Sequence, residues 1–161
     1  MIEMGHQGLN NHGINMGIVE QTATPFYYYD MDMLNETLEA ITHTTAGYPF
    51  HVHYAVKANG NPHILNTIAN YGLGADLGSG GEIQAAIEAG FNPKEMTYSG
   101  VGKTDWEIKL ALQHGVGCFN VESIPELEVI HRLAEDMDTT AHIAVRVNPD
   151  IDAHTHKYIT T

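Results

Sequence analysis

Short apolar, β-prone runs recur along most of the chain at nearly regular intervals. They begin near residues 51, 75, 96, 117 and 141, so successive starts are 24, 21, 21 and 24 residues apart. Stretches with helical spacing and helix-terminating glycines lie between the runs. A strand followed by a helix in each such interval is typical of a parallel sheet. The pattern therefore predicts an α/β fold with five β/α units.

N-capping sequences mark where the predicted helices start. Asn61 stands directly before a proline, which suits an N-cap followed by the first helical position. Thr104 and Ser123 each stand three residues before a glutamate, the spacing of a capping box. Asp30 or Asp32 is a candidate cap for an earlier helix. These signals place helices between the predicted strands.

The start of the chain differs from the repeating part. Residues 1–24 are rich in Gly, Asn and His and show weak periodicity, so we interpret them as a lead-in to a domain at 25–161. The run Tyr27-Tyr28-Tyr29 predicts a short strand before the first helix.

Two architectures fit the repeat, a doubly wound sheet and a (β/α)₈ barrel. No Gly-x-Gly-x-x-Gly follows the first strand, which disfavours a dinucleotide-binding sheet. The short, even period favours the barrel, which needs eight strands where this chain offers five. Because the last residues carry no helix or turn signal, we expect a barrel truncated to about its first five βα units.

Composition excludes several classes of function. The chain has 7 Lys and Arg against 20 Asp and Glu, a formal charge of −13, so nucleic acid would be repelled on average. No apolar run is long enough to span a membrane, and the first residues do not resemble a signal peptide. The single cysteine, Cys118, excludes an internal disulfide. We therefore expect a cytoplasmic protein with no nucleic-acid and no membrane partner.

Histidines are numerous but scattered, with close pairs only at His51/His53 and His154/His156. Residues two apart on a strand share a face, so each pair could contribute to one metal site. Neither pair is accompanied by the cysteine, aspartate or third histidine that such a site needs. We expect no metal.

Three polar residues fall at predicted strand ends, where parallel barrels place their chemistry. Lys57 closes the first run, Asp76 lies near the end of the second, and Arg146 lies in the fifth. Strand alternation predicts that Lys57 points into the barrel mouth beside apolar walls, where a lysine amine is nucleophilic towards aldehydes. On spacing alone, a solvent-facing lysine is the commoner arrangement.

Two of these features have alternative interpretations. The glycine-rich turn 78–81 could bind a phosphate at a helix start, although Asp76 and Glu82 beside it would repel that anion. Tight packing of strand against helix explains the same glycines. Arg146 needs an anionic partner, which is either a carboxylate of the barrel or a ligand.

The run Tyr54-Ala55-Val56-Lys57-Ala58-Asn59, followed by Ile64-Leu65, Ile68 and Gly72, resembles a known signature. It is the pyridoxal-phosphate attachment site of the fold-type III decarboxylases, which act on ornithine, arginine or diaminopimelate. Further ordered segments resemble the diaminopimelate branch of that family. They lie at residues 24–30, 74–76, 79–82, 90–91, 120–123, 146–149 and 154–161.

The resemblance implies an alanine-racemase-like (β/α)₈ TIM barrel that binds pyridoxal 5'-phosphate. It implies that Lys57 is the catalytic lysine and holds the cofactor covalently. Asp76 would lie near the attached end of the cofactor and Arg146 at the mouth of the site, while Glu82 and His156 would support the site. The implied reaction converts meso-2,6-diaminopimelate to L-lysine and carbon dioxide, in a homodimer whose subunits share the active site.

Other functions remain open from the sequence. A sister decarboxylase would act on ornithine, arginine or carboxynorspermidine, although the segment 154–161 favours diaminopimelate. A non-catalytic barrel that carries pyridoxal phosphate is an alternative from a different class. A truncated product that binds nothing is the third.

Overall fold

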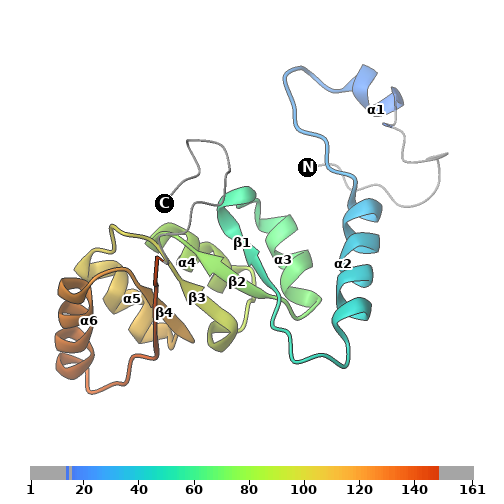
Figure 1. Ribbon diagram of the computed structural model, residues 1–161. Helices are drawn as coiled ribbons and strands as arrows, with labels where there is room; N and C mark the ends of the chain where they lie inside the picture. The colour runs from blue at the N-terminus through green and yellow to red at the C-terminus, as the bar shows by residue number, and fades with distance from the viewer. Residues whose placement is uncertain (1–13, 15, 149–161) are drawn as a thin grey trace. The chain divides into compact units, whose positions relative to one another are not determined.

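The computed structural model describes residue 14 and residues 16–148 (Figure 1). They belong to two compact units, divided between residues 50 and 51. The first unit contains two helices, α1 (Met16–Gln21) and α2 (Met31–Thr45). Asp30 is the N-cap of α2, and its Oδ1 accepts a hydrogen bond from the Met33 N–H at 2.9 Å. Of the two candidate caps, Asp30 is therefore the one used.

The prediction of a strand at Tyr27-Tyr28-Tyr29 is wrong. These residues form no regular secondary structure, and Tyr27 is 88% exposed. The Tyr27 ring stacks on that of Tyr29 instead of pairing with a neighbouring strand. β-propensity expresses a fit to a half-buried sheet surface, so without a partner strand it does not make a strand. The helix α1 was not predicted, and the domain boundary at 24/25 stays a prediction.

The second unit is built on a parallel sheet with the strand order β1-β2-β3-β4-β5. Each strand is hydrogen-bonded in parallel to the next, so the predicted five-stranded parallel sheet is confirmed. The strands are β1 (His53–Ala55), β2 (Gly74–Leu77), β3 (Met96–Tyr98), β4 (Cys118–Val121) and β5 (Ile143–Val145).

Helices connect successive strands, in agreement with the capping signals. Asn61 caps the first of them, where its Oδ1 accepts from the His63 N–H at 3.0 Å. Gly115 ends another in the left-handed conformation, with φ of 69°, which glycine adopts without strain. The connecting elements are η1 (Val56–Ala58), α3 (Pro62–Asn70), α4 (Gly80–Glu88), η2 (Pro93–Glu95), α5 (Asp105–His114) and α6 (Ile124–Asp136).

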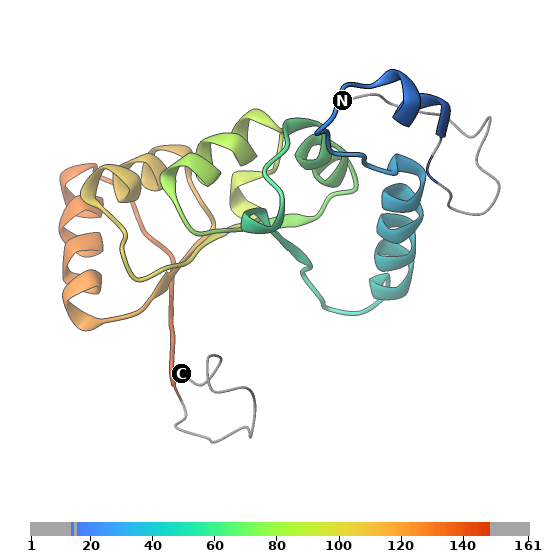
Figure 2. The same cartoon turned by 90° about the horizontal axis from the view of Figure 1, so that it is seen from above.

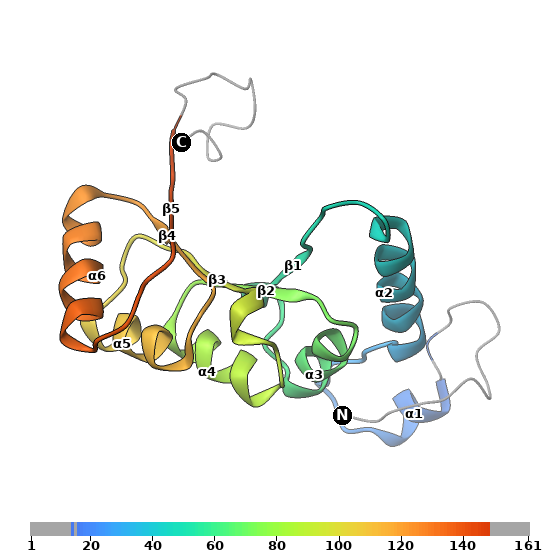
Figure 3. The ribbon, with the colours of Figure 1, turned by 90° about the horizontal axis from the view of Figure 1, so that it is seen from below.

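The helices α3 to α6 lie along one face of the sheet in chain order (Figures 2 and 3). Alternate strand residues fill the core between the two layers, and each of them is at most 2% exposed. Burial of each large apolar side chain contributes roughly 1.5–3 kcal/mol. These core residues are Ala75, Leu77, Met96, Tyr98, Phe119 and Val121. By the same alternation, Asp76, Thr97 and Asn120 face the side of the sheet away from these helices.

Candidate active site

Lys57 lies just beyond the carboxyl end of β1, in the 3₁₀ turn η1. The strand ends at Ala55, so the prediction that Lys57 closes it is wrong. Tyr54 stabilises the turn by donating its phenol hydroxyl to the Asn59 carbonyl at 3.2 Å. A 3₁₀ turn has three residues per turn, so strand alternation does not continue through it. Val56 is buried and Lys57 is exposed, so of the two predicted arrangements the solvent-facing lysine is the one present, not the lysine beside apolar walls.

Asp76 lies in the neighbouring strand, where its register partner is Ala55. Its carboxylate belongs to a small polar cluster at the carboxyl ends of the strands. The Ser99 hydroxyl donates to Asp76 Oδ1 at 2.8 Å, and the Asn120 side-chain amide donates to Ser99 Oγ at 3.0 Å. Sequence reasoning missed Ser99 and Asn120. The signal for both was their place at the end of a strand, on the same face as Asp76.

The glycine-rich turn 78–81 already has carboxylate partners for its backbone. The Gly78 N–H donates to Glu82 Oε2 at 2.7 Å, and the Gly80 N–H donates to Glu107 Oε1 at 2.7 Å. A phosphate here would compete with two carboxylates, so the phosphate interpretation fails. A Cβ on Gly80 would overlap the Trp106 ring, which supports the tight-packing interpretation. Glu82 therefore holds the turn between β2 and α4.

Glu107 is a buried carboxylate that joins two helix starts. Besides Gly80 it accepts from the Thr104 N–H at 3.0 Å and the Thr104 hydroxyl at 2.6 Å, and the Tyr98 phenol also donates to it. Burial alone would raise the pKa of Glu107, but these hydrogen bonds outweigh it and the pKa lies below its ordinary value. Burial, together with the charge of Glu107, raises the pKa of Tyr98 far above its ordinary value.

Lys103 is a second lysine at the same edge of the sheet, in the loop after β3. Its Nζ donates to the backbone carbonyls of Gly100 and Asn120 and to Glu126 Oε1, each at 2.7 Å. Its side chain is 1% exposed, and Nζ lies 5.3 Å from the centre of the Tyr98 ring. Every proton of the ammonium group thus has an acceptor, so Lys103 is a structural cation, whereas Lys57 is exposed.

Arg146 follows β5 and pairs with Glu122, which follows β4. Its Nη1 lies 3.2 Å from Glu122 Oε2 and 3.4 Å from Oε1. The arginine side chain is 55% exposed and the Glu122 side chain 12%. Of the two interpretations, the carboxylate partner is the one present. His156 lies outside the described residues.

His51 and His53, which were considered as a possible pair of metal ligands, contact different side chains. His51 Nδ1 lies 3.3 Å from Glu95 Oε2, and His53 Nδ1 lies 3.3 Å from Thr97 Oγ1. In the described part of the chain, no group of three His, Cys, Asp or Glu side chains is placed to bind a metal. Within the same residues, none of the helices combines the length and the apolar composition that crossing a bilayer requires.

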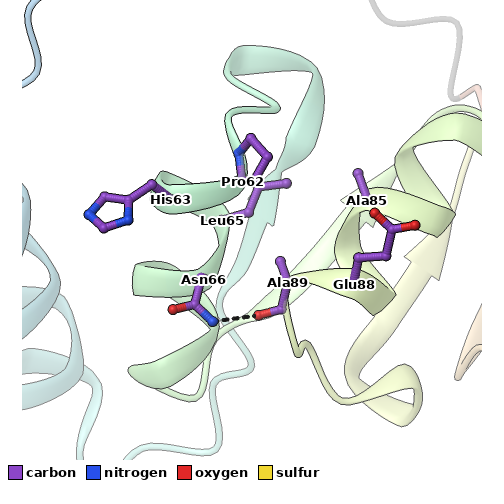
Figure 4. Close-up of a pocket in the computed structure, with 7 residues that line it drawn as sticks. All are labelled: Pro62, His63, Leu65, Asn66, Ala85, Glu88 and Ala89. Carbon is purple, nitrogen blue, oxygen red and sulfur yellow. Dashed lines mark hydrogen bonds between the residues drawn. The ribbon is translucent and has the colours of Figure 1, made fainter. Parts of the chain in front are cut away.

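A pocket of about 540 Å³ lies between α3 and α4 on the helical layer (Figure 4). Two of the residues that line it are hydrogen-bonded to each other, since the Asn66 side-chain amide donates to the Ala89 carbonyl at 3.1 Å. None of the predicted site residues lines it, so it is separate from the strand-end cluster. The lining residues are Pro62, His63, Leu65, Asn66, Ala85, Glu88 and Ala89.

Residues 31–161 match a family model described as the pyridoxal-dependent decarboxylase, pyridoxal binding domain. The chain belongs to this family. Among the pyridoxal-dependent decarboxylases, the diaminopimelate decarboxylase of Bacteroides thetaiotaomicron is 58% identical over 139 residues, which are 86% of this chain and 36% of that protein. The family model also confirms that the predicted cofactor is the one this domain binds.

Solved structures of pyridoxal-dependent decarboxylases share the fold. Diaminopimelate decarboxylase from Helicobacter pylori, solved with L-lysine, has a TM-score of 0.83 and 40% identity and covers 89% of this chain. The arginine decarboxylase of Paramecium bursaria Chlorella virus has a TM-score of 0.59 and 26% identity over 71% of it. The chain spans 36% and 31% of these two proteins. The predicted barrel fold is thereby confirmed for the five strands described.

The described residues fit pyridoxal phosphate at its aldehyde end. Lys57 offers an exposed primary amine beyond β1, and Asp76 places a carboxylate at the end of the adjoining strand. The phosphate end does not fit the turn 78–81, whose amides are bonded to Glu82 and Glu107.

Proposed function

We propose that the protein containing this chain decarboxylates meso-2,6-diaminopimelate to L-lysine, the last step of lysine biosynthesis. The observation that carries the proposal is that Lys57 is exposed just beyond the end of β1, while Asp76 lies near the end of the neighbouring strand β2. This arrangement lies within the residues that match the pyridoxal binding domain. The substrate is inferred from the relatives, since 58% and 40% identity to diaminopimelate decarboxylases exceed the 26% to the arginine enzyme.

The chain's own groups have distinct roles in this proposal. The Lys57 amine is the group that would hold the cofactor, through its aldehyde. When bound, pyridoxal phosphate supplies an electron sink for the charge left on the substrate as carbon dioxide departs. Asp76 holds a negative charge beside the attachment point, and Arg146 contacts the ligand from the mouth of the site. Glu82 supports the site by fixing the turn after β2.

A substrate panel tests this function against its alternatives. The intact protein, supplied with pyridoxal phosphate, is offered meso-2,6-diaminopimelate, ornithine, arginine and carboxynorspermidine separately, and carbon dioxide and the amine product are measured. We expect L-lysine from diaminopimelate and little product from the others. Preferred use of another substrate would assign a sister decarboxylase. Bound cofactor without carbon dioxide from any of them would point to a non-catalytic carrier.

We further propose that the intact enzyme is a cytoplasmic homodimer whose subunits share the active site. Light scattering after size-exclusion chromatography tests the oligomeric state. A mass equal to one polypeptide would contradict this part of the proposal without affecting the reaction. Fractionation of the source cells tests the location in the same independent way.

A further inference from the structure

A hydrogen-bonded chain of side chains crosses the carboxyl ends of three neighbouring strands. Asn120 in β4 donates to Ser99, which directly follows β3, and Ser99 donates to Asp76 in β2. The three side chains are half-buried. The series of hydrogen bonds therefore ends at the Asp76 carboxylate. Asp76 stands in register with Ala55, the last residue of β1, and the turn that contains Lys57 begins directly after Ala55.

The chemistry of the three groups gives the chain one direction. An amide nitrogen only donates, so Ser99 Oγ is an acceptor towards Asn120. The single hydroxyl proton of Ser99 is then available for Asp76, whose Oδ1 accepts it at 2.8 Å. A hydrogen bond from a neutral hydroxyl to a carboxylate is stronger than one between neutral groups. Asp76 is thereby held by one oxygen.

Lys103 fixes the backbone around the donors. Its Nζ binds the carbonyls of Gly100, which follows Ser99, and of Asn120 itself. This side chain is 1% exposed and its ammonium group pairs with Glu126, so it is shielded from water. The Ser99 N–H also donates to the Leu77 carbonyl at 2.7 Å, which ties it to the strand of Asp76. The donors therefore sit on a rigid frame.

We propose that Ser99 and Asn120 are positioning residues that hold Asp76 in one orientation, with Oδ2 presented to the group bound at Lys57. Within residues 16–148, the side-chain hydrogen bond of Asp76 uses Oδ1, which leaves Oδ2 for a ligand. The inference rests on the proposed function, because it requires pyridoxal phosphate at Lys57. Residues at the ends of β3 and β4 would then contribute to cofactor binding through Asp76.

Four single variants of the intact protein test it. Ser99→Ala removes the donor to Asp76, and Asn120→Asp replaces the amide donor with a carboxylate of the same shape. Each is expected to raise the Kd for pyridoxal phosphate about tenfold, because Asp76 loses either the hydroxyl that donates to it or the amide that orients that hydroxyl. Ser99→Thr keeps the hydroxyl and restores binding. Thr97→Val is the matched control, since Thr97 stands in register with Asp76 but its hydroxyl pairs with His53, while Asp76 accepts from Ser99.

A double-mutant cycle separates positioning from general loss of structure. If Ser99 acts only through Asp76, Ser99→Ala has no further effect on Kd or kcat in an Asp76→Asn background. Denaturant unfolding shows whether each variant folds. If Ser99→Ala does not fold, Ser99→Thr keeps the test valid. A merely structural role would lower stability and raise Kd to the same extent in both backgrounds.

The outcomes distinguish this inference from the proposed function. Non-additive effects of Ser99→Ala and Asp76→Asn, with rescue by Ser99→Thr, support it. Additive effects, wild-type binding by Ser99→Ala, or an equal loss in Thr97→Val would overturn it in an enzyme that still binds cofactor and decarboxylates. A wild-type protein that binds no pyridoxal phosphate would overturn the proposed function, and this inference with it.

Discussion

The ammonium nitrogen of Lys103 lies 2.7 Å from Oε1 of Glu126, and both side chains are largely enclosed, at 1% and 12% exposure. The pair joins the loop after β3 to the first turn of α6. Glu126 also accepts from the Glu122 N–H at 2.9 Å, so it holds the end of β4 as well. The carboxyl edge of the sheet is therefore organised around a buried ion pair.

Replacing Lys103 with methionine is expected to destabilise the protein by about 3–5 kcal/mol, because it leaves the enclosed Glu126 carboxylate without its cation. Urea unfolding of the intact protein measures the change. Lys109→Met is the matched control, since Lys109 is exposed on α5 and should cost no more than about 0.5 kcal/mol. Equal stability of the two variants would refute the role given to the buried pair.

Glu107→Gln should reduce stability by about 1–3 kcal/mol at neutral pH, because an amide group cannot accept all the hydrogen bonds the carboxylate receives. The folded-state pKa of Glu107 lies below its ordinary 4.5, so its contribution is present above that value and is lost as pH falls through the lowered pKa. The difference from wild type should therefore shrink in acid.

Chemical denaturation at a series of pH values measures this difference. Glu128→Gln, at an exposed position on α6, is the control and should leave stability nearly unchanged. A gap between wild type and Glu107→Gln that stayed constant from neutral to strongly acidic pH would contradict the assignment.

Arg146 and Glu122 form an exposed pair, so its contribution to stability should be small. Arg146→Ala is expected to change the free energy of unfolding by less than about 1 kcal/mol. If Arg146 also contacts the cofactor or substrate, as proposed, the same variant raises Kd or KM. Arg132→Ala is a fitting control, because Arg132 is 54% exposed and pairs with Asp105 at 3.3 Å. Unchanged Kd and KM for Arg146→Ala would reduce Arg146 to a partner of Glu122.

The sequence was sufficient for the order of strands and for several helix caps, because these depend on residues close in the chain. Asn61, Thr104 and Ser123 cap helices whose first turns lie beside them. The strand at Tyr27-Tyr28-Tyr29 failed because strand formation depends on a distant partner. Strand alternation did not predict the surroundings of Lys57, because a 3₁₀ turn replaces the last predicted strand residues, and the solvent-facing alternative is the one present.

The polar cluster at the strand ends required the register between strands. Ser99 meets Asp76 across 23 residues of chain, and Glu107 reaches Gly80 across 27. No local pattern encodes such contacts, which follow from the pairing of β2 with β3 and the packing of α5 on α4. The lysine was recognisable from its motif, whereas the residues that surround it became visible only in the fold.

The central claim is that Lys57 is the covalent anchor of pyridoxal phosphate. In the most direct measurement, the intact protein is loaded with the cofactor and treated with borohydride. The modified peptide is then mapped by mass spectrometry. The reduced cofactor should be found on the peptide that contains Lys57, should be absent in Lys57→Ala, and should remain in Lys109→Ala. Label on another lysine such as Lys103, or label that persists in Lys57→Ala, would contradict the account.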